Sequence, residues 1–296
     1  MMCVTMVYEL FNWRKSMNKI CDLHTHSVFS DGTYTPSEII NEAISVGLSA
    51  VALTDHNAAY GLGEFISAAY GKNIDAVAGV EFSTDYDGKE LHILGLFIKP
   101  EYFTQVTQLM LDVNKRKEQS NIQLIEALKS VGIILDYEEI KSSALNGMVN
   151  RAHIAGEMMK KGYTSSAAEG FEKYLAPSKG FYKPPKRLTT LQTIDFIHSI
   201  GSVSVLAHPF LSLEENELLR FLSSGESCGL NGIECYYSTN DDATTAKSLH
   251  IAAEFGLIPS GGSDFHGDRK PDIKLGTGKG NLKIPFECYK QLKELI

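Results

Sequence analysis

The sequence has no long hydrophobic run and lacks the features that mark several special classes of protein. None of its apolar stretches approaches the roughly 20 residues that a membrane-spanning helix needs. Residues 1–16 lack the contiguous apolar segment of a secretory signal peptide, so we expect a leader outside the fold and no export segment. The five cysteines form no Cys-x-x-Cys pair, which favours reduced thiols in the cytoplasm over disulfides or a thiolate zinc site.

Positive charge is also scarce. The chain has 28 Lys and Arg against 36 Asp and Glu, a net charge of −8, which argues against binding to duplex nucleic acid. Residues 101–189 nevertheless carry a net charge of +3, and the remainder carries −11. An acidic metal-holding body with a basic cover over an anionic substrate would have this distribution, although chance would also produce it.

What the chain does have is a series of short apolar runs with helical stretches between them. Runs of this length, rich in Val, Ile and Leu, are typical of strands buried on both faces. Their alternation with helices predicts parallel βα units and, in 296 residues, an α/β fold with a closed or nearly closed barrel of about seven strands. An open doubly wound sheet is the alternative, but no Gly-x-Gly-x-x-Gly follows the first run. The runs are 19–24, 49–56, 75–82, 90–97, 201–208, 231–237 and 256–264.

The helical stretches divide the chain into a barrel and an insertion. Thr35 is a plausible N-cap for a helix that starts at Pro36 and extends to residue 46, and a second helix over 243–255 ends at Gly256. Residues 101–189 break the alternation with a long predicted helix (101–131), two shorter ones (151–161 and 165–175) and a basic, proline-containing loop (179–187). We therefore expect a barrel formed by residues 17–100 and 190–296, with 101–189 as an all-α insertion that covers the substrate.

Histidines and carboxylates gather where the predicted strands end. In parallel βα barrels these ends converge on one face, and imidazoles and carboxylates are the usual ligands of Zn, Mn and Fe. Each residue alone would more often be a cap or a packed polar group. Burying all of them without a metal would be costly, so together they predict a metal site. They are His24, His26, His56, His92, His208 and His266, with Asp31, Asp55, Glu81 and Asp264.

The order of these motifs resembles that of the polymerase and histidinol phosphatase (PHP) family. The matching segments are DLHTHSVFSDGTYTPSE, ALTDHN, GVEFS, LHILGL, LAHP and GGSDFHG, from Asp22 to Gly267. The resemblance implies a distorted (β/α)7 barrel, a cluster of up to three metal ions and hydrolysis of phosphoesters. It assigns His24, His26, Glu81 and Asp264 to the first metal, Glu81, His92 and His208 to the second, and Asp31, His56 and His266 to the third. Asp55 would support a ligand imidazole or the bridging solvent. For this ligand set we expect two or three Mn, Fe or Zn ions rather than Mg.

The insertion resembles that of the family's small nucleotide-type phosphoesterases. The similar segments are NRAHIAGEMMKKGY (150–163), AAEGFEKYL (167–175) and the FYKP loop. The resemblance implies that Arg151 and His153 face the substrate phosphate, although Ala152 stands where the subgroup usually has proline. Lys183 and Arg187 would add positive charge. The structural alternatives are a solvated helix arginine, a histidine that braces the helix, and a merely soluble loop.

These features together predict a metal-dependent phosphoric ester hydrolase for a small phosphorylated substrate, with no duplex DNA or membrane partner. The nucleotide hypothesis comprises a nucleoside 3',5'-bisphosphate or 5'-mononucleotide phosphatase and a 5'-to-3' exoribonuclease on short RNA. A metal-activated hydroxide would attack phosphorus in line, with Glu81, His208 and His266 at the reacting centre. The alternatives are a non-nucleotide substrate (histidinol phosphate, a ribose cyclic phosphate or a phosphoprotein), a non-catalytic metal-binding module, and a C–N hydrolase, for which no bridging lysine is found. The sequence determines neither the group that protonates the leaving oxygen nor the oligomeric state.

Overall fold

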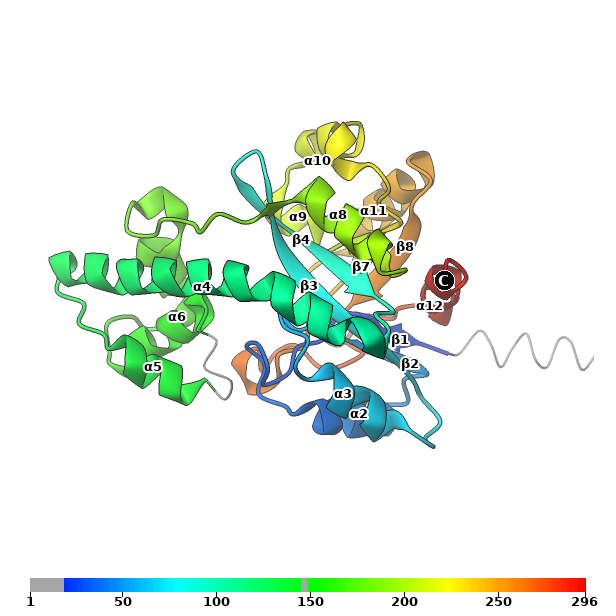
Figure 1. Cartoon of the computed structure of the whole chain (residues 1–296), viewed down its shortest axis with the longest axis horizontal. Coiled ribbons are helices and arrows are strands. Elements are labelled where there is room, and N and C mark those ends of the chain that lie inside the picture. Colours follow the sequence, from blue (N-terminus) through cyan, green and yellow to red (C-terminus); the bar gives the residue numbers. More distant parts are fainter. Residues whose placement is uncertain (1–18, 145–148) are drawn as a thin grey trace, which may run out of the picture.

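The computed structural model describes residues 19–144 and 149–296 and has a nearly closed barrel at its centre (Figure 1). The expected leader, residues 1–16, lies outside the described residues. The sheet has the strand order β1-β2-β3-β4-β6-β7-β8, with β5 paired to β3. Backbone bonds from Leu23 N–H to Gly261 O (3.0 Å) and from His26 N–H to Phe265 O (2.9 Å) join its two ends. The strands are β1 (Cys21–Asp22), β2 (Ala50–Leu53), β3 (Asp75–Tyr86), β4 (Lys89–Leu96), β5 (Leu188–Thr189), β6 (Val203–Leu206), β7 (Gly232–Tyr237) and β8 (Ile258–Gly262).

The predicted α/β barrel is confirmed, but the expectation that its strands are all parallel is wrong for β4. This strand pairs antiparallel with β3 on one side and with β6 on the other. A two-residue turn at Asp87 and Gly88 joins β3 to β4, and both turn residues have positive φ (52° and 78°), as a tight hairpin turn requires. Because β4 is buried like its neighbours, its apolar run does not reveal its direction.

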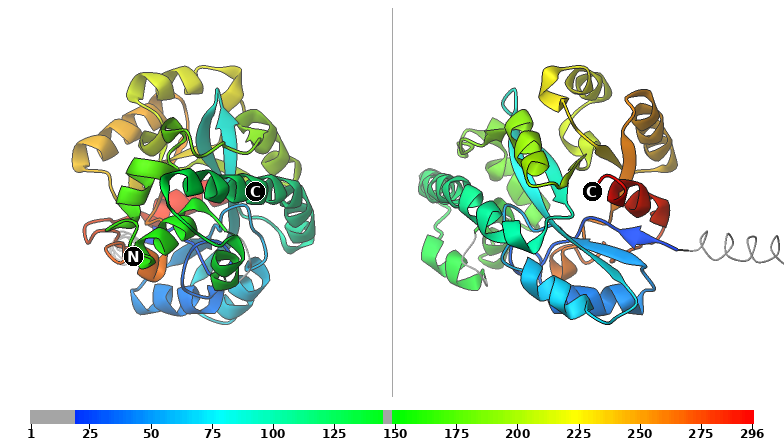
Figure 2. Two further views of the ribbon diagram at one scale, coloured as in Figure 1. Left: turned by 90° about the vertical axis from the view of Figure 1, so that its left-hand side faces the viewer. Right: turned by 45° about the vertical axis from the view of Figure 1, so that its right-hand side comes forward.

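Helices cover the outside of the barrel. The predicted N-cap is confirmed: α2 (Pro36–Ser45) begins after Thr35, whose side chain accepts from Glu38 N–H while the Glu38 carboxylate accepts from Thr35 N–H. The helix α12 (Phe286–Lys293) packs at the end of the barrel opposite the insertion, next to β1 and β8 (Figures 1 and 2). The remaining outer helices are α3 (Leu62–Ala69), α8 (Thr190–Ser199), α9 (Pro209–Ser212), α10 (Glu215–Leu222) and α11 (Asp242–Glu254), with short 3-10 turns at Gly225–Ser227 and Gly267–Arg269.

Alternating strand residues serve two cores. On β2, Ala50 and Ala52 belong to a cluster with Ile284 and Leu292, whereas Val51 and Leu53 pack with α2 and α3 residues such as Ile39 and Phe65. The four described cysteines are free, and burial raises the pKa of Cys288 to about 12. Within residues 19–144 and 149–296, no helix is both long and apolar enough to cross a membrane.

Between β4 and β5 the chain forms helices with a core of their own. The long α4 packs its first half on the barrel through Val106 and Met110, and its second half contributes Leu124 and Leu128 to a separate cluster with α6. The left view of Figure 2 shows these helices lying across one end of the barrel. They are α4 (Phe103–Leu128), α5 (Tyr137–Ser143), α6 (Arg151–Lys160), α7 (Ala167–Gly170) and a π-helical turn (Phe171–Leu175), with 3-10 turns at Pro100–Tyr102, Lys129–Val131 and Pro177–Lys179.

Candidate metal centre

The histidine pair after β1 opens the site. His24 and His26 are two residues apart in extended backbone, so their side chains point to the same side. Hydrogen bonds from His26 N–H to Phe265 O (2.9 Å) and from Asp264 N–H to His24 O (2.9 Å) tie this segment to the residues that follow β8. The two Nε2 atoms lie 3.1 Å apart, and both rings are fully buried.

Glu81 lies at the centre of the imidazoles. Its Oε2 is 3.2 Å from Nε2 of His24 and of His26 and 2.9 Å from Nδ1 of His56. Its Oε1 is 2.6 Å from Nδ1 of His92 and 3.0 Å from Nε2 of His208. The carboxylate is fully buried, and Oε2 has no hydrogen bond of acceptable geometry. A single carboxylate thus bridges five rings.

Two aspartates complete the cluster on the side of His266. Asp264 Oδ1 is 3.2 Å from His26 Nε2 and 3.4 Å from His266 Nδ1. Asp31 Oδ1 is 3.2 Å from His266 Nε2, and its Oδ2 is 4.0 Å from His56 Nε2. Asp264 and His208 both have positive φ (56° and 26°), a strained backbone that clusters at functional sites.

The donor set fits divalent metal ions. Four groups have ligand atoms within 4.8 Å of one another, and together they contain all nine residues predicted as ligands. Metal ions coordinate buried carboxylate oxygens and ring nitrogens that would otherwise face one another without a hydrogen bond. The groups are His26, Asp31, His56 and His266; His24, His26 and Asp264; His24, Glu81 and His208; and His56, Glu81 and His92.

The electrostatics keep the carboxylates ionised. Burial alone would raise the pKa of Glu81, but the imidazoles of His56, His92 and His24 hold it well below its ordinary value. Burial lowers the pKa of His56 to about 4, whereas the contacts of His26 with the Asp264 and Glu81 carboxylates overcome burial and raise its pKa to about 9. Carboxylates coordinate metal ions in their ionised form.

Groups behind the ligands fix which ring nitrogen faces the cluster. His24 Nδ1 lies 3.2 Å from Glu234 Oε1, so this nitrogen donates its proton to the carboxylate and Nε2 faces the cluster. His266 Nδ1 is 2.8 Å from the Asp264 carbonyl oxygen, which it can only donate to. Asp55 belongs to no ligand group: its carboxylate accepts from Ser27 Oγ (2.6 Å) and Ser30 Oγ (2.6 Å).

Three supporting residues had no separate sequence signal. Glu234 lies in the apolar strand β7 and also accepts from His208 N–H (2.7 Å). Tyr237 donates its hydroxyl to Asp264 Oδ2 (2.8 Å), and Lys270 Nζ lies 2.7 Å from the same oxygen. A buried acid inside an apolar strand is the one feature that could have indicated Glu234.

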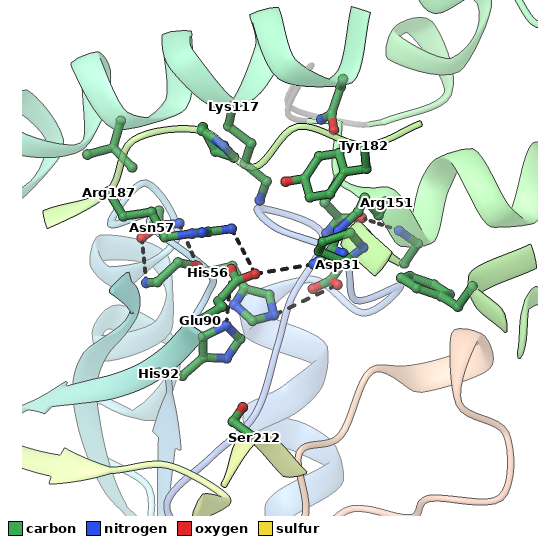
Figure 3. Close-up of a pocket in the computed structure, with 18 of the residues that line it drawn as sticks. Asp31, His56, Asn57, Glu90, His92, Lys117, Arg151, Tyr182, Arg187 and Ser212 are labelled. Atoms are coloured by element: carbon green, nitrogen blue, oxygen red, sulfur yellow. Dashed lines mark hydrogen bonds and ion pairs between the residues drawn. The ribbon is translucent and has the colours of Figure 1, made fainter. Parts of the chain in front are cut away.

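Beside the cluster is a cavity of about 420 Å³ between the barrel and the insertion (Figure 3). Metal-ligand candidates line one side, and Lys117, Arg151 and Arg187 line another. Glu90 Oε2 accepts from Arg151 Nη2 (3.2 Å) and Arg187 Nη2 (2.8 Å). The Arg151 guanidinium lies 4.4 Å from the centre of the Tyr182 ring. The cavity is therefore lined by metal-ligand candidates on one side and by cationic side chains on another.

Of the four residues predicted to contact substrate phosphate, the structure brings two into this cavity. Arg151 and Arg187 line it, whereas Lys183 is exposed and, among the described residues, only its carbonyl oxygen is hydrogen-bonded, by Ser120 Oγ. His153 is buried in the first turn of α6, where its Nδ1 contacts the N-cap residue Asn150. Sequence reasoning missed Lys117 and Glu90, because a lone charge on a long helix or at a strand start is usually a surface residue.

Comparisons with known proteins agree with this geometry. The model of the PHP domain matches residues 22–182. The chain is 33% identical over 264 residues to the 5'-3' exoribonuclease Rnm of Escherichia coli strain K12, covering 87% of this chain and 88% of that protein. It is 31% identical over 277 residues to the 3',5'-nucleoside bisphosphate phosphatase of Chromobacterium violaceum, covering 93% and 97%. A solved structure described as an amidohydrolase from Chromobacterium violaceum, with bound sulfate and no metal, aligns with a TM-score of 0.82 at 26% identity, covering 93% and 96%. The chain therefore belongs to the PHP domain family.

Proposed function

We propose that this chain is a metal-dependent phosphoesterase that hydrolyses a phosphate ester of a nucleotide or of short RNA. The observation that carries the proposal is the convergence of six histidines and three carboxylates beside a cavity walled by Arg151 and Arg187. The relatives named above, an exoribonuclease and a nucleoside bisphosphate phosphatase, support a nucleotide substrate over histidinol phosphate or a phosphoprotein. The group at the centre of the cluster is the carboxylate of Glu81, whereas a C–N hydrolase would be expected to carry a bridging lysine.

Two or three divalent ions, Mn, Fe or Zn, would be held by the four ligand groups around Glu81. When bound, they would supply positive charge to the phosphoryl oxygens and lower the pKa of water. Glu81 belongs to two of the four ligand groups and so joins them. Asp55 holds Ser27 and Ser30 beside His26 through hydrogen bonds. His208 Nδ1 is buried and has no hydrogen-bond partner in the described part of the chain.

Arg151 binds the substrate phosphate in this proposal. Its planar guanidinium presents parallel N–H groups that match two phosphate oxygens, a geometry that lysine lacks. Tyr182 and Phe171 hold the group by its faces, with ring centres 4.4 and 5.7 Å away. Glu90 fills the anion position between Arg151 and Arg187, and the phosphate would take over part of these bonds. Residues 101–189, which carry Arg151 and a net charge of +3, then act as a basic cap over the substrate.

A substrate panel with added Mn²⁺ tests the proposal. The panel contains a nucleoside 3',5'-bisphosphate, a 5'-mononucleotide, a short 5'-phosphorylated RNA, histidinol phosphate and a ribose cyclic phosphate, with duplex DNA as the negative control. We expect the highest kcat/KM on a nucleotide or short RNA. Preference for histidinol phosphate, or no hydrolysis of any member by metal-loaded protein, would overturn it.

A further inference from the structure

A second cavity lies on the neighbouring side of α4. It has a volume of about 400 Å³ and is lined by residues of α4 and α5, by Tyr60, which follows β2, and by Val149, which precedes α6. Lys117 lines both this cavity and the one beside the metal ligands. In Figure 3 the Lys117 side chain extends from α4 toward Glu90 and the two arginines. The two cavities therefore meet at a cation.

The charge left over in the second cavity is positive. Its two acidic residues are already neutralised, since Asp112 pairs with Arg116 (3.1 Å) and Glu118 pairs with Lys141 (2.5 Å). Lys115 and Lys117 have no ion pair or hydrogen bond with any residue in the described ranges. Desolvation lowers the pKa of Lys117, so an anion beside it would relieve the cost of its burial.

The same cavity also offers an aromatic surface. Tyr60 is 48% exposed, which leaves part of the residue accessible for stacking on a base. At the boundary with the first cavity, Asn114 Nδ2 donates to the Asn57 carbonyl oxygen (3.1 Å). Asn57 lines the first cavity and Asn114 the second, so this bond forms part of the wall between them. A ligand that passes Lys117 would enter a compartment with both a cation and a ring.

We propose that the second cavity binds the next nucleotide of an oligonucleotide substrate, with Lys117 contacting a phosphate at the junction of the two cavities. Tyr60 stacks on the base of that nucleotide, and Lys115 neutralises its backbone. This inference rests on the proposed phosphoesterase function and narrows its substrate to a chain of at least two nucleotides.

The test compares kcat/KM for 5'-phosphorylated RNA of two to four nucleotides with kcat/KM for a nucleoside 3',5'-bisphosphate, in Mn²⁺. Tyr60→Ala should lower the ratio of RNA to bisphosphate activity by about 5- to 100-fold, the effect of losing one stacked base, and Lys115→Met should also lower this ratio. Tyr70→Ala and Lys99→Met, at exposed residues outside both cavities, should leave the ratio within about twofold. All four substituted residues are exposed, and matching Tm values would show that each variant folds.

The outcomes separate this inference from the function on which it rests. If the wild-type protein hydrolyses neither substrate, the proposed function fails. If it hydrolyses both and neither Tyr60→Ala nor Lys115→Met changes the ratio, the phosphoesterase stands and the second cavity is not a nucleotide site. Lys117→Met should lower kcat/KM more for every substrate that carries a second phosphate than for a 5'-mononucleotide. Equal decreases for all substrates would show that Lys117 does not contact a phosphate at the junction.

Discussion

At the scale of single residues, the site depends on side chains that hold other side chains in place. Glu234 fixes the His24 ring from behind, and Tyr237 and Lys270 share the outer oxygen of Asp264. These contacts hold the candidate ligand atoms in place, which would reduce the ordering needed when an ion binds. The same is true of Arg151, which is held by two aromatic rings, by Glu90 and by the Leu175 carbonyl oxygen.

Arg151 can be removed without touching the ligand set. Arg151→Ala should lower kcat/KM by about 10- to 100-fold, because a charge-assisted hydrogen bond contributes about 1.5–3 kcal/mol. Arg151→Lys should recover little of this loss, since an ammonium cannot form the bidentate contact. Metal content, measured by elemental analysis, should match the wild type in both variants. Loss of metal from Arg151→Ala would contradict the assigned role.

His153 makes the stability of the insertion depend on pH. Burial, with the Arg269 charge adding to it, lowers the pKa of His153 to about 4, below the value of about 6.5 expected in the unfolded chain. The unfolded state then binds a proton that the folded state excludes, so stability falls as pH drops from about 6.5 toward 4. His153→Gln keeps a side chain suited to the capping position but does not titrate.

The measurement is urea unfolding of both proteins at about pH 7.5 and about pH 5. The wild type should lose about 2 kcal/mol more than His153→Gln over this range. Parallel losses in the two proteins would show that His153 is not the titrating group.

Sequence could predict which residues meet at the end of the barrel, but not the residues that lie behind them. A histidine or carboxylate after a strand belongs to a motif such as HTH or SDFH, and its position on the barrel end follows from the fold. Glu90 and Lys117 belong to no motif, and their importance comes from α4 and β4 meeting across a cavity. That meeting depends on tertiary packing, which hydrophobic periodicity does not encode.

At the scale of elements, the approach of β8 to the segment after β1 needs glycine. A Cβ on Gly262 would overlap the Cβ of His24 and lie 2.7 Å from its backbone nitrogen. Gly262→Ala should therefore displace His24 and destabilise the fold by about 3 kcal/mol. Gly63 in α3 has open space around it, and Gly63→Ala should stabilise by about 0.5–1 kcal/mol.

Urea unfolding of the two variants beside the wild type checks this prediction. The opposite signs of the two effects form the internal control, because each adds one methyl group. A Gly262→Ala protein with wild-type stability would show that this contact is looser than the structure has it.

Helices were more predictable than strand direction. The helices over 36–45, 103–128 and 151–160 lie within the stretches expected for them, because cap residues and apolar spacing are local signals. The antiparallel pairing of β4 was missed, although the Asp87–Gly88 dipeptide between two apolar runs is a hairpin signal. Seven similar apolar runs favour a uniform parallel barrel, and only the turn distinguishes this strand.

At the scale of the whole molecule, charge is divided between barrel and insertion. The net charge of residues 101–189 is +3 and that of the rest is −11. Bound divalent ions would offset part of the acidic excess at the ligand cluster, and the basic helices bring Arg151 and Lys117 to the same cavity. Barrel and insertion thus each contribute charged side chains to the same cavity.

The central claim, that residues from across the barrel form one metal centre around Glu81, is tested by the metal content of the full-length protein. Elemental analysis of protein purified without chelators should find about two to three transition-metal ions per chain. Glu81→Gln should lower this number sharply, whereas Tyr70→Ala should not change it. Fewer than about one ion per chain in the wild type, or full occupancy in Glu81→Gln, would contradict the account.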